Sequence, residues 1–317
     1  MSASANEARV IEVRGLTKRY GHTLAVDDLS FDVRPGHVTG FLGPNGAGKS
    51  TTMRLILGLD LPTAGSATVG GRRYASLRRP LFEVGATLEA RSVHPGLTAH
   101  SHLLALAASN GIPARRVEEV LNVVGLASVA RKRTGEFSLG MGQRLGIAGA
   151  LLGDPGVLVL DEPSNGLDPE GIVWVRTLLR SLAAEGRAVF VSSHLMAEMA
   201  LTADRLIVIG RGRLLADTTV EDFIRRASSS HVRVRSPEAK RLAELLRAKG
   251  AGVRARRGEV LLVTKVDAAA IGDIAYAHGV ALHELVMEDV SLEEAFMKLA
   301  GDATDYHSAP TRDGRVA

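Results

Sequence analysis

Short apolar runs alternate with helix-compatible stretches over the first two hundred residues of the chain. The segments 38–42, 157–160 and 189–191 are short, rich in valine, leucine and phenylalanine, and lead into glycine or polar residues. Such runs are typical of strands buried in a parallel sheet. The segments 52–57 and 145–152 are apolar and suit helices. This order of strands and helices predicts an α/β fold.

Residues from about 91 to 150 predict a helical subdomain within this first domain. Two sets of apolar residues recur there at helical spacing, which is typical of helix faces that pack into a core. The sets are Leu97, Leu103, Leu104 and Ala107, and Val117, Val120, Leu121 and Val124. The first domain as a whole is expected to span residues 9–225.

The pattern changes after this first domain. Strands are predicted at 231–235, 252–255, 260–264 and 281–286, and helices at 238–249 and 268–278. The order βαββαβ predicts a small α+β, ferredoxin-like C-terminal domain over residues 231–300. A capping-box pattern at 291–294 opens a final predicted helix. Residues 301–317 mix Asp, Pro, Gly and Arg, and we expect a disordered tail.

The first predicted strand leads directly into a glycine-rich loop and a helix. The loop fits the phosphate-binding pattern G-x-x-x-x-G-K-[ST]. Its residues are Gly43, Pro44, Asn45, Gly46, Ala47, Gly48, Lys49, Ser50 and Thr51. Glycines let backbone N–H groups turn toward phosphate oxygens, and the helix N-terminus adds positive potential. We expect Lys49 to contact the β- and γ-phosphates of ATP and Ser50 to bind Mg²⁺.

Two acidic residues end the strand at 157–160. Because ligands bind at the carboxyl ends of parallel strands, Asp161 is a candidate Mg²⁺ ligand. Glu162 comes one residue later and is expected to point to the other side of the strand. There it could polarise the water that attacks the γ-phosphate. The alternative interpretation is a strand end followed by a solvated acidic turn.

A third motif precedes the helix-like stretch at 145–152. The run 137–141 reads Phe-Ser-Leu-Gly-Met and resembles the LSGGQ signature of ATP-binding cassettes, the ATPase subunits of ABC transporters. Ser138 and Gly140 match the signature, whereas Leu139 and Met141 replace glycine and glutamine. The resemblance implies a P-loop NTPase cassette in which Ser138, Gly140 and Met141 bind the ATP of the other protomer. A helix N-cap without a ligand is the alternative.

The same resemblance implies roles for four other residues. Tyr20 would stack on adenine, Asp168 would lie near the dimer interface, and His194 would contact the γ-phosphate. Glu89 stands where the family usually has glutamine, as in export cassettes related to bacitracin and lantibiotic self-protection. An acid there could ligate Mg²⁺ and connect the ATP site to the membrane partner. Without the resemblance, the alternative interpretations are a packed surface tyrosine at Tyr20, a structural histidine at His194 and a surface acid at Glu89.

Composition narrows the classes of function. The chain has 317 residues, a net charge of +4 and no cysteine, so disulfide and thiolate metal sites are excluded. No apolar run approaches the roughly 18–20 residues of a membrane span, and no signal peptide is predicted. Basic residues are not clustered with aromatic residues, so nucleic-acid binding is not expected.

The resemblance therefore implies the ATPase subunit of a bacterial exporter of drugs, antibiotics or lipids. It implies a homodimer that uses ATP and Mg²⁺ and works with a separate integral-membrane permease at the cytoplasmic face of the membrane. The run 291–296 further resembles the C-terminal segment of daunorubicin-type export ATPases. The alternative is a soluble cassette that acts on the ribosome or DNA, which the single P-loop and the lack of heptads disfavour. The transported cargo stays open.

Overall fold

The computed structural model describes residues 11–89, 93–227, 231–256 and 258–288. The chain divides into two compact units, Met1–Val220 and Glu221–Ala317, and each has its own sheet and core. The final helix predicted from residue 291 and the predicted tail at 301–317 lie outside the described residues. Within the described ranges, no helix has both the length and the apolar character that crossing a membrane requires.

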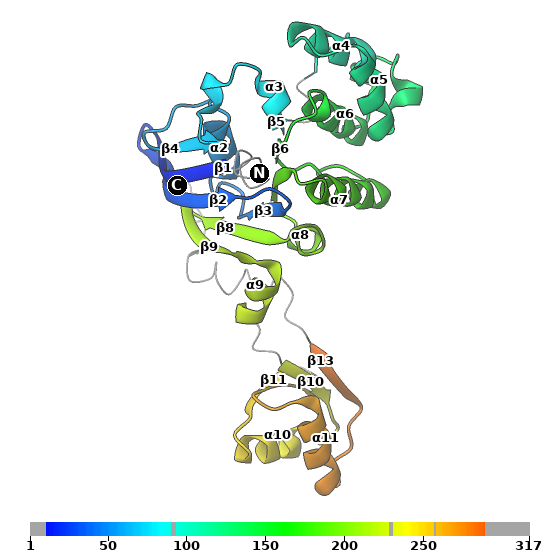
Figure 1. Ribbon diagram of the computed structural model, residues 1–317. Coiled ribbons are helices and arrows are strands. Elements are labelled where there is room, and N and C mark those ends of the chain that lie inside the picture. The colour runs from blue at the N-terminus through cyan, green and yellow to red at the C-terminus, as the bar shows by residue number, and fades with distance from the viewer. Residues whose placement is uncertain (1–10, 90–92, 228–230, 257, 289–317) are drawn as a thin grey trace, which may run out of the picture. The chain divides into compact units, whose positions relative to one another are not determined.

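A six-stranded sheet in the order β5-β6-β7-β3-β8-β9 forms the centre of the first unit (Figure 1). Its strands are parallel except β9, which runs antiparallel to β8. They are β3 (Val38–Leu42), β5 (Val84–Thr87), β6 (Val157–Leu160), β7 (Ala188–Ser193), β8 (Arg205–Gly210) and β9 (Arg213–Thr219). The strands β3, β6 and β7 are buried at every position, as their apolar sequences predict. Their carboxyl ends share one edge of the sheet.

A second, antiparallel sheet in the order β2-β1-β4 belongs to the same unit. Its strands are β1 (Ile11–Tyr20), β2 (Thr23–Val33) and β4 (Ala64–Val69). Inward-facing residues of β1 and β2, such as Val13 and Phe31, are buried, whereas Arg14 and Ser30 are exposed. This alternation is expected of a sheet with one face on the core.

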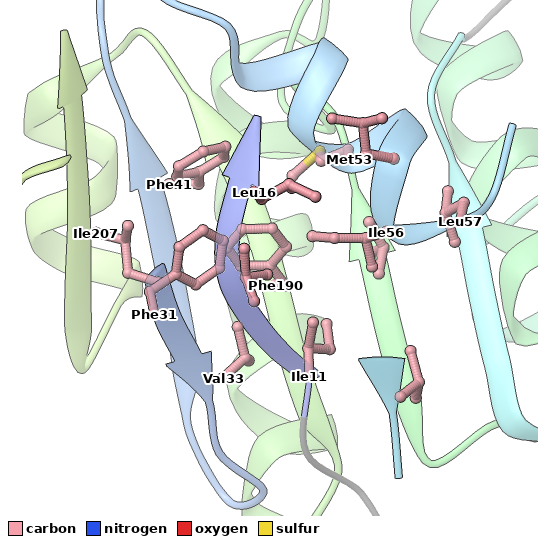
Figure 2. Close-up of a cluster of buried hydrophobic side chains, with 14 of the residues drawn as sticks. Ile11, Leu16, Phe31, Val33, Phe41, Met53, Ile56, Leu57, Phe190 and Ile207 are labelled. Atoms are coloured by element: carbon pink, nitrogen blue, oxygen red, sulfur yellow. The ribbon is translucent and has the colours of Figure 1, made fainter. Parts of the chain in front are cut away.

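Three phenylalanines join the two sheets in the core of the first unit. Phe31 of β2, Phe41 of β3 and Phe190 of β7 lie together in Figure 2. Their ring centroids are 5.0 Å apart for Phe41 and Phe190 and 5.7 Å apart for the other two pairs. Tilted aromatic pairs at this spacing are attractive beyond the apolar area they bury.

Truncation of Phe190 to alanine is expected to destabilise the first unit by about 3–5 kcal/mol, since it leaves a cavity between the sheets. Urea denaturation followed by the fluorescence of Trp174, the single tryptophan, measures this change. The control is Leu61→Ala, because Leu61 is 80% exposed in the same unit and its truncation should change stability by less than about 0.5 kcal/mol. Equal effects of the two variants would contradict the assignment of Phe190 to the core.

The helices of the first unit fall into two groups. Three helices gather beyond β5, away from β8 and β9 (Figure 1): α4 (Ala99–Ser109), α5 (Arg115–Val123) and α6 (Leu139–Leu151). Short 3₁₀ turns at Ala127–Val129 and Thr134–Glu136 connect α5 to α6. The other helices are α2 (Lys49–Ile56), α3 (Pro80–Glu83), α7 (Pro169–Ala184) and α8 (Met196–Thr202), and a 3₁₀ turn lies at Tyr74–Ser76. A further helix, α9 (Val220–Ala227), begins at the last residue of the unit.

One of the two predicted helix faces is correct and the other is partly wrong. Val117, Val120, Leu121 and Val124 are all buried. In α4, however, the buried line is Ala99, Leu103 and Ala107, which are spaced by four residues. Leu104 lies beside that line and is 37% exposed. Leu97 comes before the N-cap Thr98, so it is outside the helix and is 39% exposed.

The second unit holds a four-stranded antiparallel sheet in the order β11-β12-β10-β13. Its strands are β10 (His231–Arg235), β11 (Gly252–Arg256), β12 (Val260–Thr264) and β13 (Glu284–Glu288), and its helices are α10 (Ala239–Ala248) and α11 (Ala268–Ala277). The apolar faces of both helices pack with alternate residues of β10 and β12 in one core. This βαββαβ topology confirms the predicted ferredoxin-like fold.

The last strand of the second unit begins three residues later than the sequence predicts. Residues 281–286 are apolar enough to predict a strand, but β13 pairs with β10 only from Glu284, opposite Arg235, to Glu288, opposite His231. Because β10 ends at Arg235, its antiparallel pairing with β13 starts only at Glu284.

Candidate functional site

The glycine-rich loop lies between β3 and α2 and has a conformation that requires glycine. Gly46 and Gly48 have φ angles of +79° and +102°, which side chains rarely tolerate. A Cβ atom on Gly48 would also lie 2.4 Å from the carbonyl oxygen of Ala25 on β2. The loop can therefore approach β2 closely and turn its N–H groups inward, which makes a cradle for an anion.

A cavity of about 260 Å³ opens at this loop. Its lining consists of Ala25, Asn45, Gly46, Gly48, Lys49, Ser50, Thr51 and Glu162. Lys49 is 7% exposed, and its Nζ donates to the carbonyl oxygen of Gly43 at 2.7 Å. The same Nζ is 3.8 Å from Oε1 of Glu162. Burial lowers the pKa of Lys49, while the Glu162 and Asp161 carboxylates act in the opposite direction.

The two carboxylates follow β6, which ends at Leu160. Glu162 has a φ angle of +51°, in the left-handed region that non-glycine residues seldom occupy. Strand alternation therefore does not determine its direction, contrary to the sequence-based reasoning. The turn directs the Glu162 side chain toward Lys49 and His194, while Asp161 accepts a hydrogen bond from Ser192.

His194 comes directly after β7 and contacts Glu162. Its Nδ1 lies 2.7 Å from Oε2 of Glu162. An ionised carboxylate only accepts hydrogen bonds, so Nδ1–H is the donor and Nε2 is left for another partner. Glu162 thus has one oxygen near Lys49 and the other on His194, at the carboxyl edge of the sheet. The structure brings these three predicted catalytic residues together.

Two residues that the sequence did not single out hold this turn. Ser192 Oγ accepts a 2.9 Å hydrogen bond from the Glu162 N–H and donates to Asp161 Oδ1. Gln143 of α6 donates from Nε2 to the Glu162 carbonyl oxygen at 3.1 Å. The sequence feature that could have pointed to Ser192 is its position directly after the apolar run 189–191. Gln143 gave no signal, because its contact depends on how α6 packs.

The region of the predicted signature motif lies apart from the P-loop cavity. Ser138 is the N-cap of α6, and its hydroxyl accepts a 3.2 Å hydrogen bond from the Met141 N–H. The N–H groups of Leu139 and Gly140 precede the first intrahelical hydrogen bond and can meet an anion. Ser138 lines a second cavity, of about 340 Å³, which includes none of the P-loop residues. Among their lining residues, the cavity at Ser138 and the cavity at the P-loop have none in common.

The leucine that departs from the signature has a structural explanation. A Cβ atom on Gly166 would lie 2.1 Å from the Leu139 side chain, and Gly166 has a φ angle of +75°. Leu139 therefore occupies space that the missing side chain of Gly166 leaves open. Asp168, two residues on, is the N-cap of α7 and accepts a 2.9 Å hydrogen bond from the Gly171 N–H.

Glu89 follows β5, whose carboxyl end lies at the same edge of the sheet as that of β6. The strand β5 ends at Thr87, whose carbonyl oxygen accepts a 2.9 Å hydrogen bond from the Asp161 N–H. Glu89 follows two residues later and is exposed. Its position suits a connection between the site and the molecular surface.

Tyr20 stands at the end of β1, in the hairpin that leads to Ala25 of the P-loop cavity. Tyr20 is 45% exposed as a residue, and the Lys18 amine lies 4.7 Å from the centroid of its ring. The Tyr20 hydroxyl donates to Asp60 at 2.7 Å, and Arg54 of α2 donates to the same carboxylate at 2.7 Å. The aromatic ring is thus connected to the helix that follows the P-loop.

The hydrogen bonds from Tyr20 and Arg54 predict that the Asp60 carboxylate stays ionised at low pH. The hydrogen bonds from Arg54 and then Tyr20 lower the pKa of Asp60 to about 2. Because the pKa is depressed, the network stabilises the fold above the ordinary carboxyl pKa of about 4, and this contribution is lost as pH falls toward 2. An NMR titration from pH 5 to 3 should find Asp60 ionised throughout. Arg54→Gln should return its pKa toward the ordinary 3.8; Tyr20→Phe should raise it less, and the reverse order would contradict the assignment.

Comparison with known proteins agrees with this geometry. Residues 26–165 match the family described as ABC transporter, and residues 230–293 match a domain of unknown function. The chain is 42% identical to the bacitracin transport ATP-binding protein BcrA of Bacillus licheniformis, over 68% of this chain and 72% of that protein. It is 35% identical to the uncharacterized ABC transporter ATP-binding protein YhcH of Bacillus subtilis, over 93% of this chain and 97% of that protein.

A solved dimeric structure of a bacterial ABC transporter cassette has a TM-score of 0.61 to this chain. The two sequences are 25% identical, and the match covers 66% of this chain and 98% of that one. The match with YhcH extends the relationship through most of both units, because it covers nearly the full length of both proteins. The sheet order, the P-loop and these matches agree, and the chain belongs to the ABC transporter family, as one of its ATP-binding subunits.

Proposed function

We propose that this ATPase powers export through a membrane permease encoded by a separate gene. The observation that carries the proposal is the meeting of Lys49, Glu162 and His194 beside the glycine cradle, at the carboxyl edge of the sheet. This arrangement provides a cation for phosphate, a base for water and a histidine that orients the base. The transport named for the bacitracin relative supports the export role.

The site supports direct attack of water on the γ-phosphate of ATP. The cradle and Lys49 hold the phosphate chain, so charge that develops on the transferred group meets fixed donors. Glu162 accepts a proton from the attacking water while the oxygen of that water forms a bond to the γ-phosphorus. The bond from that phosphorus to the bridging oxygen breaks, which leaves ADP and phosphate. His194 holds the base through Nδ1 and can approach the γ-phosphate with Nε2.

The donor set also fits Mg²⁺. Ser50 supplies a hydroxyl in the P-loop cavity, and Asp161 supplies a carboxylate at the end of β6. Mg²⁺ prefers such oxygen ligands and completes its shell with water and substrate phosphates. When bound, the ion would neutralise phosphate charge; Glu89 is a further candidate ligand near this edge.

Two copies of the chain would complete two sites. Each P-loop would bind one ATP against the first turn of α6 of the other copy, where Ser138, Gly140 and Met141 lie. The separate cavities at Ser138 and at the P-loop support this division, as does the dimeric cassette structure. Asp168 would lie near the dimer interface, and Tyr20 would stack on the adenine ring. Closure of the dimer on ATP would move the permease, and hydrolysis would reopen it.

The experiment that tests the export role is membrane recruitment. The chain is expressed with and without the product of the gene next to its own, and washed membranes are probed for the chain. Recruitment only with the neighbour, together with ATPase activity of the recovered complex, is the expected result and would identify the neighbour as the membrane partner. A chain that instead sediments with ribosomes or DNA would favour the non-transport alternative. The cargo can be screened once the permease is known.

A further inference from the structure

Ser192 has a buried hydroxyl that contacts two residues of the proposed ATP site at once. In the sheet, Val191 of β7 pairs with Leu160 of β6, so Ser192 lies opposite Asp161. Its side chain is fully buried. The hydroxyl donates to Asp161 Oδ1 and accepts the Glu162 N–H at 2.9 Å. Both hydrogen bonds are directional, so the serine determines the relative placement of its two acidic neighbours.

The Glu162 backbone needs such support. A non-glycine residue with a φ angle of +51° is strained, at a cost on the order of 1–3 kcal/mol. Ser192 holds the N–H of this residue, and Gln143 holds its carbonyl oxygen. The left-handed turn is what directs the Glu162 side chain to Lys49 and His194.

The hydrogen bond from Ser192 to Asp161 affects metal binding, the second proposed function of the site. A carboxylate has two oxygens, and Ser192 engages Oδ1, which fixes the rotation of the group and leaves Oδ2 for a ligand. Hydrogen bonds of this kind orient metal ligands in proteins, and their loss typically lowers metal affinity or activity about 10- to 100-fold.

We propose that Ser192 is a positioning residue that fixes the Mg²⁺-binding carboxylate of Asp161 and the catalytic carboxylate of Glu162 with one hydroxyl. This inference rests on the proposed function, since both roles belong to the ATP site. Ser192 itself need not touch ATP or the ion. Its effect passes through the two acidic residues, so one substitution alters both metal use and hydrolysis.

A pair of nearly isosteric variants isolates the hydroxyl. Threonine and valine have the same shape, so Ser192→Thr keeps the hydroxyl that Ser192→Val removes. Ser192→Ala removes it without added volume, which covers the case that the larger valine does not fold. Thr39→Val is the control, because Thr39 is buried in β3 of the same sheet and its Oγ1 has no hydrogen-bond partner.

The first measurement is kcat with Mg²⁺ and ATP. The kcat of Ser192→Val and of Ser192→Ala should be about 10- to 100-fold below that of wild type, whereas the kcat of Ser192→Thr and of Thr39→Val should stay close to the wild-type value. The second is the affinity for a non-hydrolysable ATP analogue, with Mg²⁺ and with EDTA. The gain in affinity on adding Mg²⁺ should shrink in the valine and alanine variants, while their affinity in EDTA should match wild type.

Two results would overturn the inference. Equal behaviour of the threonine and valine variants would show that side-chain volume matters and the hydroxyl does not. Equal loss of affinity with Mg²⁺ and with EDTA would show general distortion of the P-loop cavity. Failure of the proposed function looks different, because the wild-type chain would then show no Mg²⁺-dependent ATPase activity at all.

Discussion

Replacement of Glu162 by glutamine is expected to lower kcat for ATP hydrolysis about 100- to 10,000-fold, the range for loss of a general base. The amide fills the same space but cannot accept a proton from water. Binding of ATP should persist, because Lys49 and the P-loop are unchanged and a negative charge beside the γ-phosphate is removed. Since only hydrolysis would reopen the closed pair of protomers, Glu162→Gln should accumulate as an ATP-bound dimer.

Size-exclusion chromatography with light scattering, in Mg²⁺ and ATP, measures the dimer, and quantification of the bound nucleotide shows whether ATP is intact. The matched control is Glu244→Gln, which removes an exposed carboxylate from the second unit and should leave turnover and oligomeric state unchanged. Full hydrolysis by Glu162→Gln would remove this residue from the role of base. Loss of turnover together with loss of ATP binding would instead indicate a distorted site.

The strands and loop that position the site are predictable from sequence because their causes are local. An apolar run of three to five residues that leads into glycine or polar residues predicts a buried strand, and the P-loop spacing predicts a cradle within nine residues. The structure agrees for β3, β6 and β7, and for the helix that follows the loop. The contact between Glu162 and His194 follows in part, because both come at the carboxyl ends of neighbouring parallel strands.

The remaining features depend on partners distant in sequence. The place of Ser192 beside Asp161 follows from the register of β7 against β6, and the contact of Gln143 follows from the packing of α6. The left-handed turn at Glu162 cannot be read from residue type, since glutamate rarely adopts it. Leu104 is apolar like its neighbour Leu103, and only the packed helix shows which of the two is buried.

Removal of the Lys49 side chain is expected to weaken ATP binding about 10- to 150-fold, from the 1.5–3 kcal/mol of a charge-assisted hydrogen bond. Lys49 is buried beside Glu162 and Asp161, and its amine offsets their negative charge at the place where phosphate would bind. Without the amine, those carboxylates would repel the phosphate chain, so the loss should approach the upper end of this range.

Three substitutions separate charge from shape at this position. Lys49→Met keeps much of the length without the charge, and Lys49→Arg keeps the charge in a larger group that fits the cavity less well. Calorimetric titration with a non-hydrolysable ATP analogue should therefore rank affinity as wild type above Arg, with Met and Ala lowest. Lys132→Ala, at an exposed lysine of the same unit, should bind as wild type does. If Lys49→Met also bound like wild type, the amine would have no part in holding phosphate, and the cradle of backbone N–H groups would have to account for binding alone.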